Sequence, residues 1–434
     1  MRVYVENANK RKTVYDILNI FYEKDQIIFD KDQAEVLVGD DFLILGNEKI
    51  SYEDNLDLKV KLYTYLVEKT GYESPWGILT GSKPSKLLKK YSLDQIREKY
   101  LVSESKAHIL DQVKRTQDRE DFDPKDFNLY INIPFCPTRC DYCSYPTIVG
   151  SHVDKSSYVD FLLKELDQVK IPEKLDTVYI GGGTPSFLSY DDLIRLLEKI
   201  KENFTFREFT FEAGREDSLD FEKLEIFKAY GVDRISLNPQ SFTKNVIDKT
   251  GRIQDLDKLI GLYEKAYDLG FIINMDFIVG LYGETRGTFK ENFKILKDLS
   301  PHNITFHALA QKVGSKYHEE SVLGSKKDSL LISEDIHSFS KENSYKPYYL
   351  YRQKNIISNL ENIGYERDDT LSRYNILINE ELENIIGLGM NANSKLMNGK
   401  KYRNGRNLRD YYEYLRQEIE EKNKIISSFL ENLS

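Results

Sequence analysis

Cysteine occurs only three times in the 434-residue chain, and all three residues lie in the stretch Cys136-Pro-Thr-Arg-Cys140-Asp-Tyr-Cys143. A chain that uses cysteine nowhere else is not building disulfides. Three thiolates at the spacing C-x3-C-x2-C can hold three irons of a [4Fe–4S] cube and leave the fourth iron open. An open iron can bind a small ligand and pass an electron to it. The pattern therefore predicts a redox-active cluster whose metal ligands are Cys136, Cys140 and Cys143.

A structural zinc site is the alternative metal centre for this motif. Such a site takes four protein ligands. Because the chain has no fourth cysteine, His152, the nearest histidine, would have to complete it. We therefore favour the open-iron cluster. Tyr142, directly before the last cysteine, fits two roles equally well: an aromatic face beside an adenine, or a shield for the cluster.

Composition limits the classes of partner. The formal charge of -9 argues against nucleic acid as the main partner, although local basic patches remain compatible with it. No apolar run reaches the roughly 18 residues of a membrane span. The N-terminal Met1-Arg-Val-Tyr-Val-Glu6 lacks the layout of a signal peptide. Reduced cysteines without an export signal indicate a cytoplasmic protein.

Strand-like and helix-like segments alternate through the middle of the chain, as expected for a parallel β/α array. Six units fall short of the eight of a complete barrel, so we predict an open, partial (β/α)6 TIM-like barrel. The expected strands are Asn128–Ile133, Thr177–Ile180, Glu208–Glu212, Arg234–Leu237, Ile272–Asp276 and Asn303–His307. Helical periodicity fills the intervals between them.

The flanks differ from this core in pattern. Residues 1–115 combine short strand-like runs with a helix near 58–70, which predicts an N-terminal α+β accessory domain. The charged run Arg115–Pro124 is typical of a linker, so the core is placed at 116–345. Residues 346–434 are expected to be mostly helical and to end in a helix around 407–424.

In a parallel β/α array the chemistry gathers at the C-terminal ends of the strands. The cysteines follow the first strand, Gly181-Gly-Gly-Thr184 the second and Glu212-Ala-Gly-Arg215 the third. Asn238-Pro-Gln-Ser241 follows the fourth, and Asp276 is expected to end the fifth. A glycine-rich turn alone is more often a tight turn than a ligand cradle, Glu212 alone is compatible with solvated surface, and Asp276 is compatible with a helix cap. Their coincidence in five successive units favours one shared site.

These motifs resemble those of radical S-adenosylmethionine enzymes. More closely, the chain resembles the oxygen-independent coproporphyrinogen III oxidase family, in its HemZ-type branch (coproporphyrinogen dehydrogenase). The similar core segments are Tyr130–Cys136, Cys140–Pro146, Phe211–Arg215 and Asn274–Leu281. Outside the core, Pro75–Lys86 and Pro347–Gln353 resemble that branch too.

The resemblance implies a role for each matching residue. Cys136, Cys140 and Cys143 would ligate a [4Fe–4S] cluster. Tyr130 would lie near the sulfur of S-adenosyl-L-methionine and take part in catalysis. The remaining cofactor-binding positions would be Tyr142, Gly182, Gly183, Thr184, Glu212, Gln240, Arg252 and Asp276. Arginine offers a bidentate fork for a carboxylate, and acidic side chains accept bonds from ribose hydroxyls.

The resemblance also implies an oxidoreductase of anaerobic haem and porphyrin biosynthesis. A 5′-deoxyadenosyl radical would remove hydrogen from propionate side chains of coproporphyrinogen III, which lose carbon dioxide to give protoporphyrinogen IX. The implied partners are the porphyrinogen and a one-electron donor such as flavodoxin or ferredoxin, and residues 346–434 would close over the substrate. Lys83, Lys86, Arg215 and Arg352 are candidates for binding its carboxylates, although each is more often an ordinary surface cation.

Two other activities remain open for this scaffold. One is a related radical methyltransferase or tetrapyrrole-modifying enzyme. The other is a haem-binding chaperone, which is disfavoured because the single tryptophan, Trp76, lies outside that group's His-Asn-x-x-Tyr-Trp signature. The chain also departs from the best-known oxidases at Asn132, where they carry histidine, and at Tyr282, where proline is usual.

Overall fold

A computed structural model describes residues 1–81 and 83–432. The chain divides into two compact units. Unit 1 comprises Met1–Arg115 together with Leu350–Asn362, and unit 2 comprises Thr116–Tyr349 and the chain from Ile363 onward. The boundary after Arg115 lies at the same residue as the predicted end of the N-terminal domain. The region predicted at 346–434 is shared between the two units, and its closing over a substrate stays a prediction.

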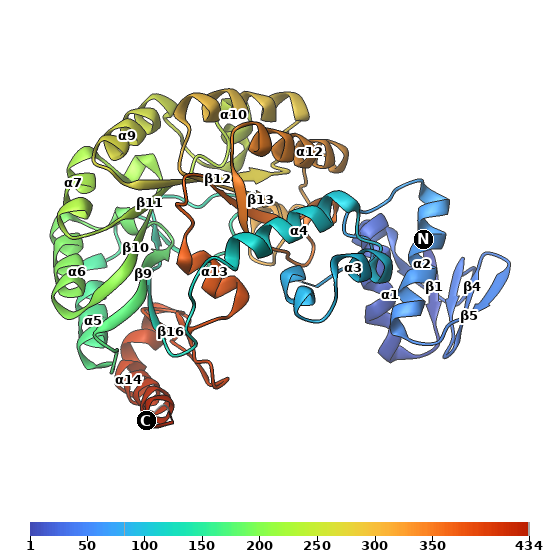
Figure 1. Cartoon of the computed structure of the whole chain (residues 1–434), viewed down its shortest axis with the longest axis horizontal. Coiled ribbons are helices and arrows are strands. Elements are labelled where there is room, and N and C mark those ends of the chain that lie inside the picture. The colour runs from blue at the N-terminus through green and yellow to red at the C-terminus, as the bar shows by residue number, and fades with distance from the viewer. Residues whose placement is uncertain (82, 433–434) are drawn as a thin grey trace. The chain divides into compact units, whose positions relative to one another are not determined.

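Unit 2 is built on a parallel sheet that confirms the predicted partial barrel. Neighbouring strands pair in the order β13-β12-β11-β10-β9-β6, and every pair in that row is parallel. The helices that follow these strands lie in sequence around the outside of the sheet (Figure 1). The strands are β6 Phe127–Ile133, β9 Lys174–Gly182, β10 Thr205–Gly214, β11 Arg234–Leu237, β12 Ile272–Val279 and β13 Asn303–Ala308. The helices are α5 Lys155–Gln168, α6 Tyr190–Asn203, α7 Phe221–Ala229, α9 Leu256–Asp268, α10 Arg286–Leu299 and α12 Lys326–Glu342.

The burial pattern of each segment explains which element it forms. All four residues of β11 are buried, as expected for a strand covered on both faces. In α6, Leu193, Leu196 and Ile200 are buried at helical spacing, and Ser189 caps the helix by accepting from the Asp192 amide. The same arrangement of one apolar stripe per helix covers the sheet around the barrel.

The C-terminal part of the chain extends the barrel sheet at both edges. The strand β16, Asn384–Leu388, pairs in parallel with β6, which the sequence analysis did not predict. Beyond it lie the antiparallel strands β17 Asn393–Lys395 and β18 Lys401–Arg403. At the other edge β15, Asn362–Glu366, pairs antiparallel with β13, and β14 Lys346–Tyr351 follows β15 in the sheet order. The main helices here are α13 Arg373–Glu380 and α14 Leu408–Glu431.

The smaller elements of unit 2 lie mainly in the loops after the barrel strands. The cysteine loop carries the two-stranded pair β7 Phe135–Cys136 and β8 Ile148–Val149. The short helices are η3 Pro185–Phe187, η4 Glu216–Ser218, α8 Lys244–Ile247, η5 Asp248–Thr250 and α11 Lys316–Glu319. These loops supply most of the residues of the candidate site.

The fifth barrel strand is longer than predicted. The strand β12 continues past Asp276 to Val279, so Asp276 does not end the strand as expected. Phe277, Ile278 and Val279 are all buried, and their apolar side chains prolong the strand in place of a helix cap. Asp276 therefore lies within the sheet, opposite Thr305 of β13.

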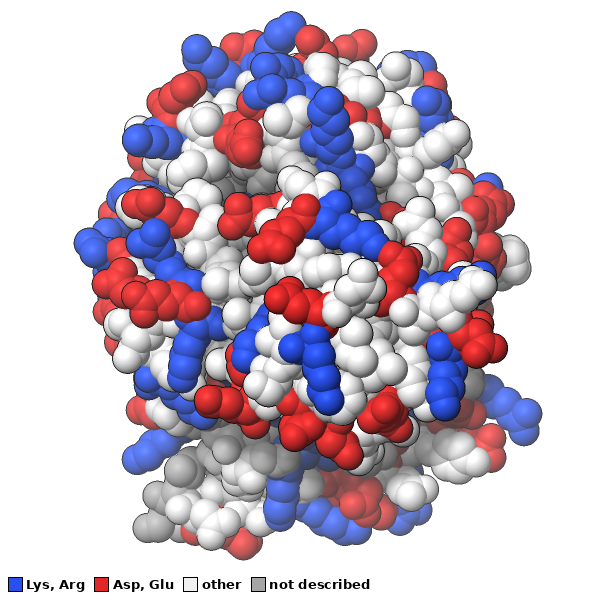
Figure 2. Space-filling view, turned by 90° about the vertical axis from the view of Figure 1, so that its right-hand side faces the viewer, with Lys and Arg blue, Asp and Glu red and all other residues white. Residues whose placement is uncertain are grey.

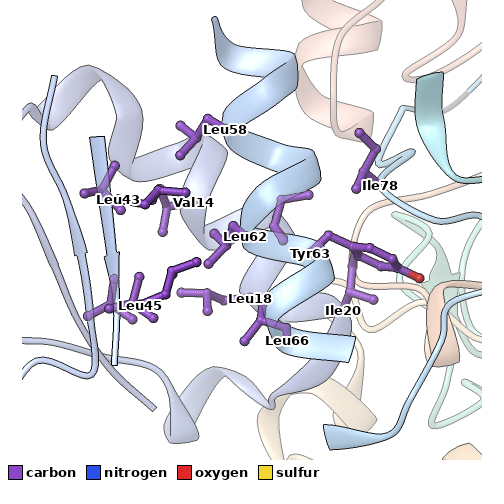
Figure 3. Close-up of a cluster of buried hydrophobic side chains, with 14 of the residues drawn as sticks. Val14, Leu18, Ile20, Leu43, Leu45, Leu58, Leu62, Tyr63, Leu66 and Ile78 are labelled. Atoms are coloured by element: carbon purple, nitrogen blue, oxygen red, sulfur yellow. The ribbon is translucent and has the colours of Figure 1, made fainter. Parts of the chain in front are cut away.

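Unit 1 has its own sheet and hydrophobic core. Its strands pair in the order β2-β1-β3-β4-β5, and α1 and α2 pack on one another. Val14 and Leu18 of α1 meet Leu58 and Leu62 of α2 beside the sheet (Figure 3). The elements are β1 Arg2–Val5, α1 Ala8–Phe21, η1 Lys24–Gln26, β2 Ile28–Phe29, β3 Val36–Val38, β4 Phe42–Leu45, β5 Glu48–Ser51, α2 Asn55–Thr70, η2 Pro84–Lys89, α3 Leu93–Tyr100, α4 Glu104–Gln117 and η6 Ile357–Asn359.

The two flanking motifs of the sequence meet inside unit 1. Trp76 is fully buried and donates from Nε1 to Oε2 of Glu361 at 2.7 Å, and Lys106 pairs with the same carboxylate. Arg352 is 3% exposed and donates to the carbonyl of Leu360 at 3.1 Å. Burial lowers the pKa of Arg352 to about 10. Arg352 is thus an internal cation, so its interpretation as a surface residue is wrong, whereas a role in substrate binding stays a prediction.

The described residues contain no helix that is long and apolar enough to cross a membrane. On the face shown in Figure 2, Lys and Arg side chains alternate with Asp and Glu, and neither sign forms a continuous area. That distribution offers no extended basic stripe on this face for a phosphate backbone.

Glu284 is a buried carboxyl group in the loop between β12 and α10. It is 3% exposed, and its Oε2 accepts from the Gly280 amide at 2.8 Å. Burial raises the pKa of Glu284 to about 8, although bonds from the amides of Gly280 and Leu281 oppose this. The folded protein therefore keeps this group protonated at neutral pH.

We predict that Glu284 makes the protein less stable as the pH rises. The folded pKa lies above the unfolded value, so the folded state holds an extra proton between the two values and its free energy of unfolding falls across that window. Glu284→Gln should remove this loss, and its stability relative to wild type should increase between pH 6 and pH 9, measured by urea unfolding. Glu291→Gln, with a 56% exposed side chain, is the matched control. Parallel stability curves for wild type and Glu284→Gln would show that the group is not buried in its neutral form.

Candidate metal and cofactor site

The cysteine loop begins directly after β6 and is pinned by backbone bonds. The Ile148 amide donates to the Pro134 carbonyl at 2.7 Å, and the Gly150 amide donates to the Cys136 carbonyl at 3.2 Å. A tight turn joins the other two cysteines, because the Cys143 amide donates to the Cys140 carbonyl at 3.0 Å. All three cysteines are free and half-buried, as a ligand set held for a metal requires.

Cys136 lies against the glycine-rich turn that follows β9. The Thr184 hydroxyl donates to Cys136 Sγ at 3.4 Å. A Cβ atom on Gly183 would lie 3.0 Å from that sulfur, and one on Gly182, whose φ is +122°, would lie 2.3 Å from Asn132 Oδ1. Glycine is therefore required at both positions: a side chain on Gly183 would crowd the Cys136 sulfur, and one on Gly182 would collide with Asn132. Burial raises the pKa of the Cys136 and Cys143 thiols, so a bound metal would have to favour their thiolates.

The cysteine loop was expected to bind either a [4Fe–4S] cluster or a single zinc ion. In residues 1–81 and 83–432, no three Cys, His, Asp or Glu side chains lie close enough to bind one metal ion. His152, the fourth ligand that a zinc site would need, is exposed. A [4Fe–4S] cube places each thiolate on a different iron, so its ligands are spread farther apart than those of one zinc. Three free cysteines in one loop are the donor set that such a cube takes.

Two buried arginines surround Cys140. Arg215 donates to Cys140 Sγ at 3.7 Å and to the Thr138 carbonyl at 3.3 Å, and it is ion-paired with Asp217. Arg215 is 6% exposed, so its interpretation as a surface cation is wrong. Arg252 is 4% exposed and pairs with Glu216 at 3.2 Å. These guanidinium groups place positive charge beside a sulfur that a metal would hold as thiolate.

Tyr142 lies close to Cys140 and Arg252. Burial raises the pKa of the Tyr142 hydroxyl, as does the charge of Cys140, whereas Arg252 lowers it. Tyr142 is therefore a neutral aromatic group next to the cysteines. Both predicted roles, packing beside an adenine and shielding the cluster, remain predictions.

Glu212 is aimed by an irregularity in its strand. The register between β10 and β11 shifts between Phe211 and Gly214, and Glu212 lies within this irregular stretch. The Glu212 carboxylate accepts a short hydrogen bond from the Tyr179 hydroxyl and another from the Gly182 amide at 3.2 Å. Burial raises the pKa of Glu212 to about 7, against the hydrogen bond from Tyr179 that lowers it. Near neutral pH this group can both donate and accept a proton.

Asp276 and Gln240 are joined through the backbone. Gln240 has a φ of 64°, and its amide donates to the Asp276 carbonyl at 2.9 Å while its own carbonyl accepts from Ile278. Asn274 donates to Asp276 Oδ1 at 2.8 Å, and His307 Nε2 lies 3.8 Å from the same oxygen. Burial raises the pKa of Asp276, but the bonds from His307, Asn274 and Thr305 outweigh it and leave the pKa lowered. Asp276 is therefore a carboxylate at neutral pH.

Three tyrosine rings are stacked at this end of the barrel. Tyr179 lies 4.2 Å from Tyr374 between ring centroids, at an interplanar angle of 20°, and Tyr130 is nearly parallel to both. Tyr374 comes from α13, far along the chain, and the sequence analysis missed it because no motif marks it. Tyr145, which follows the last cysteine by two residues, is 64% exposed.

Asn132 links Tyr130 to the C-terminal part of unit 2. Its Oδ1 accepts from the Tyr130 hydroxyl at 3.1 Å, and its Nδ2 donates to the Met390 carbonyl at 2.7 Å. The Tyr158 hydroxyl reinforces this contact: it donates to the Asn132 carbonyl and accepts from the Met390 amide. An amide satisfies a donor and an acceptor at once. Asn132, which stands where the best-known oxidases carry histidine, thus orients Tyr130 by accepting the hydrogen bond from its hydroxyl.

Several buried polar atoms of the site lack a protein partner. Among the described residues these include Gln240 Oε1, Asn238 Oδ1, Arg252 Nε and Thr138 Oγ1. Buried polar groups are normally hydrogen-bonded, so such orphans indicate a missing partner. Together with the space kept by Gly182 and Gly183, they fit a polar small-molecule cofactor. The structure brings Cys136, Gly183 and Thr184 together and places Glu212 beside Gly182, but the role of each residue stays a prediction.

Comparison with known proteins places the chain in a family. Residues 130–296 match the family model of the radical SAM superfamily. The chain is 34% identical over 396 residues to the oxygen-independent coproporphyrinogen-III oxidase-like protein HemZ of Bacillus subtilis, which covers 83% of this chain and 79% of that protein. It is 25% identical over 277 residues to the heme chaperone HemW of Buchnera aphidicola subsp. Schizaphis graminum, which covers 62% of this chain and 70% of that protein.

A solved structure supports the fold. The coproporphyrinogen III oxidase HemN of Escherichia coli, a radical SAM enzyme, superposes with a TM-score of 0.58 at 23% identity, covering 80% of this chain and 79% of that one. The family's cofactors are a [4Fe–4S] cluster and S-adenosylmethionine, which the donor set described above fits. The chain belongs to the radical SAM superfamily, within the oxygen-independent coproporphyrinogen III oxidase-like family.

Proposed function

We propose that this protein decarboxylates propionate side chains of coproporphyrinogen III to give protoporphyrinogen IX. The observation that carries the proposal is the extent of the similarity to the oxidase-like HemZ, which spans 83% of the chain and so reaches well beyond the superfamily core at 130–296. Each propionate that becomes a vinyl group loses a hydrogen atom, carbon dioxide and one electron, so a one-electron acceptor takes part.

The chain's own residues divide the work of binding. Cys136, Cys140 and Cys143 would hold the cluster, which when bound supplies the electron that cleaves S-adenosylmethionine. Gly182, Gly183 and Thr184 would admit the cofactor close to the backbone. Arg252, already charged and buried, suits a carboxylate.

The two carboxyl groups of the site would take different parts. Asp276, whose pKa is lowered, would accept bonds from hydroxyl or ammonium groups as a fixed anion. Glu212, whose pKa is raised to about 7 by burial, would lose its proton when a cationic group of the cofactor binds. Tyr130, oriented by Asn132, would close the site on the side of the cysteines, and the exposed ring of Tyr145 offers an aromatic face to a substrate.

A haem-binding chaperone is the second candidate, because the relative at 62% coverage carries that name. A chaperone would bind haem and leave a porphyrinogen unchanged. The two candidates therefore differ in product formation, which is measurable directly.

We predict that the reconstituted protein forms vinyl products. Under anaerobic conditions with dithionite, S-adenosylmethionine and coproporphyrinogen III, mass spectrometry should detect monovinyl and divinyl products, each conversion losing one carbon dioxide. Formation of 5′-deoxyadenosine without any decarboxylated product would overturn the oxidase proposal and leave the radical chemistry standing. Tight haem binding without turnover would favour the chaperone.

We predict that Cys140→Ala abolishes the brown cluster absorbance near roughly 400 nm. Loss of one of three ligands should also lower bound iron severalfold, because the chain offers no replacement thiol. Ser144→Ala, a change at a half-buried position one residue beyond the motif, is the matched control and should keep wild-type iron and absorbance. Unchanged absorbance in Cys140→Ala would refute the ligand assignment.

A further inference from the structure

Glu165 is a fully buried acid on α5 to which the proposed function gives no part. Within unit 2, α5 packs against both β16 and the C-terminal helix α14 (Figure 1). The Glu165 carboxylate is ion-paired with Lys422 of α14, which is also fully buried. Taking two charges out of water is costly, so a buried ion pair is weak evidence for a gain in stability. The other contacts of Glu165 show what the pair holds in place.

Four donors converge on the Glu165 carboxylate. Its Oε2 accepts from the Gly389 amide at 2.8 Å and from the Tyr411 hydroxyl at 2.7 Å. Its Oε1 accepts from Asn404 Nδ2 at 2.8 Å and from Lys422. Asn404 Nδ2 also donates to the Gly389 carbonyl at 2.8 Å. An ionised carboxylate offers four acceptor sites and no donor, so it suits this set of partners. It thereby holds both backbone groups of Gly389, one of them through Asn404.

The turn that begins at Gly389 lies at the same end of the barrel as the cysteine loop. The strand β16 runs parallel to β6, and Leu388 lies opposite Ile131, so the two strands end side by side. Gly389 has a φ of +89°, and a Cβ atom there would lie 2.6 Å from the Asn132 carbonyl oxygen. Only glycine tolerates this conformation and this approach without strain. The turn is therefore packed directly on the end of β6.

Asn132 extends the contact from the turn into the cofactor site. Its side chain bonds the Met390 carbonyl on one side and the Tyr130 hydroxyl on the other. Its Oδ1 also lies against Gly182, where an added Cβ atom would collide with it. A shift of the turn would therefore move Asn132 relative to both Tyr130 and Gly182.

We propose that Glu165 is a positioning residue for the S-adenosylmethionine site. By fixing the turn at Gly389, it sets the place of Asn132. Asn132 in turn orients Tyr130 and borders the space beside Gly182. The proposal rests on the cofactor site assigned under the proposed function. Glu165 acts only through this chain of contacts, and Lys422 supplies the counter-charge that a buried carboxylate needs.

The first test separates the position of the turn from the stability of the ion pair. Lys422→Met keeps the carboxylate and its three other donors but removes its counter-charge. Glu165→Met/Lys422→Met removes both charges, and with them the acceptor for the Gly389 amide. Replacing a buried pair by apolar side chains of similar volume costs less stability than leaving one charge unpaired. Lys422→Met should therefore melt about 10 °C below wild type and also below the double variant.

Affinity for S-adenosylmethionine is measured by equilibrium dialysis on the full-length, reconstituted protein. Hydrogen exchange of the segment 387–394 is measured by mass spectrometry. We expect the double variant to bind the cofactor about tenfold more weakly, to exchange this segment about fivefold faster and to keep bound iron within about twofold of wild type. Lys422→Met should stay within about twofold of wild type in all three values, although it melts lower. A merely structural role would give the opposite order of affinities.

A second pair of variants leaves both charges in place and decides the question alone if the double variant does not fold. Tyr158 and Tyr411 are both fully buried. The Tyr158 hydroxyl bonds Asn132 and Met390, whereas the Tyr411 hydroxyl bonds Glu165. Tyr158→Phe should weaken S-adenosylmethionine binding about fivefold, as expected for the loss of about one hydrogen bond. Tyr411→Phe, the matched control, should stay within about twofold of wild type.

Two results would overturn the proposal. One is wild-type affinity for S-adenosylmethionine in the double variant or in Tyr158→Phe. The other is an affinity that falls in step with the melting temperature across the variants. Absence of cofactor binding by the wild-type protein would instead overturn the cofactor site on which the proposal rests. These measurements do not use coproporphyrinogen, so a failure of the oxidase proposal is distinguishable from a failure of this one.

Discussion

The parallel register between β6 and β9 is the constraint on which the site depends. Ile133 lies opposite Gly182, so the chain that leaves β6 toward Cys136 and the chain that leaves β9 toward Thr184 emerge side by side. Backbone bonds from Gly183 to Ile133 and from Thr184 to Phe135, both 2.8 Å, continue the pairing past the strands. A slip of this register would separate the sulfur from the glycines and remove the space that they keep open.

Burial then gives similar groups different chemistry. Glu212 and Asp276 are both carboxyl groups at strand positions of one barrel, yet burial raises the pKa of Glu212 to about 7 while hydrogen bonds hold the pKa of Asp276 low. Environments that separate two such values assign the groups different roles. The arginines follow the same principle: Arg215 and Arg252 lie buried beside Cys140, whereas Arg139 stays exposed.

The sequence predicts the features that depend on local pattern. Alternating strand and helix periodicity was sufficient to predict the six parallel strands. Because the cysteines directly follow the first predicted strand, their place after β6 could be predicted too. What pattern does not encode is long-range contact. Tyr374 and β16 reach the barrel from the C-terminal part of the sequence. Arg352 is buried against Leu79, which lies far before it in the sequence. Asp276 was misplaced because an apolar run can extend a strand past a polar residue.

Electron paramagnetic resonance of the reduced protein tests the central claim most directly. The claim is that three cysteines hold an open-iron cluster next to a cofactor site formed by Gly182, Glu212 and Asp276. Dithionite-reduced, anaerobically reconstituted protein should show the signal of a [4Fe–4S] cluster, and addition of S-adenosylmethionine should shift its g values because the cofactor binds the open iron. A signal that is unchanged by the cofactor, or the absence of a four-iron signal in protein loaded with iron and sulfide, would contradict it.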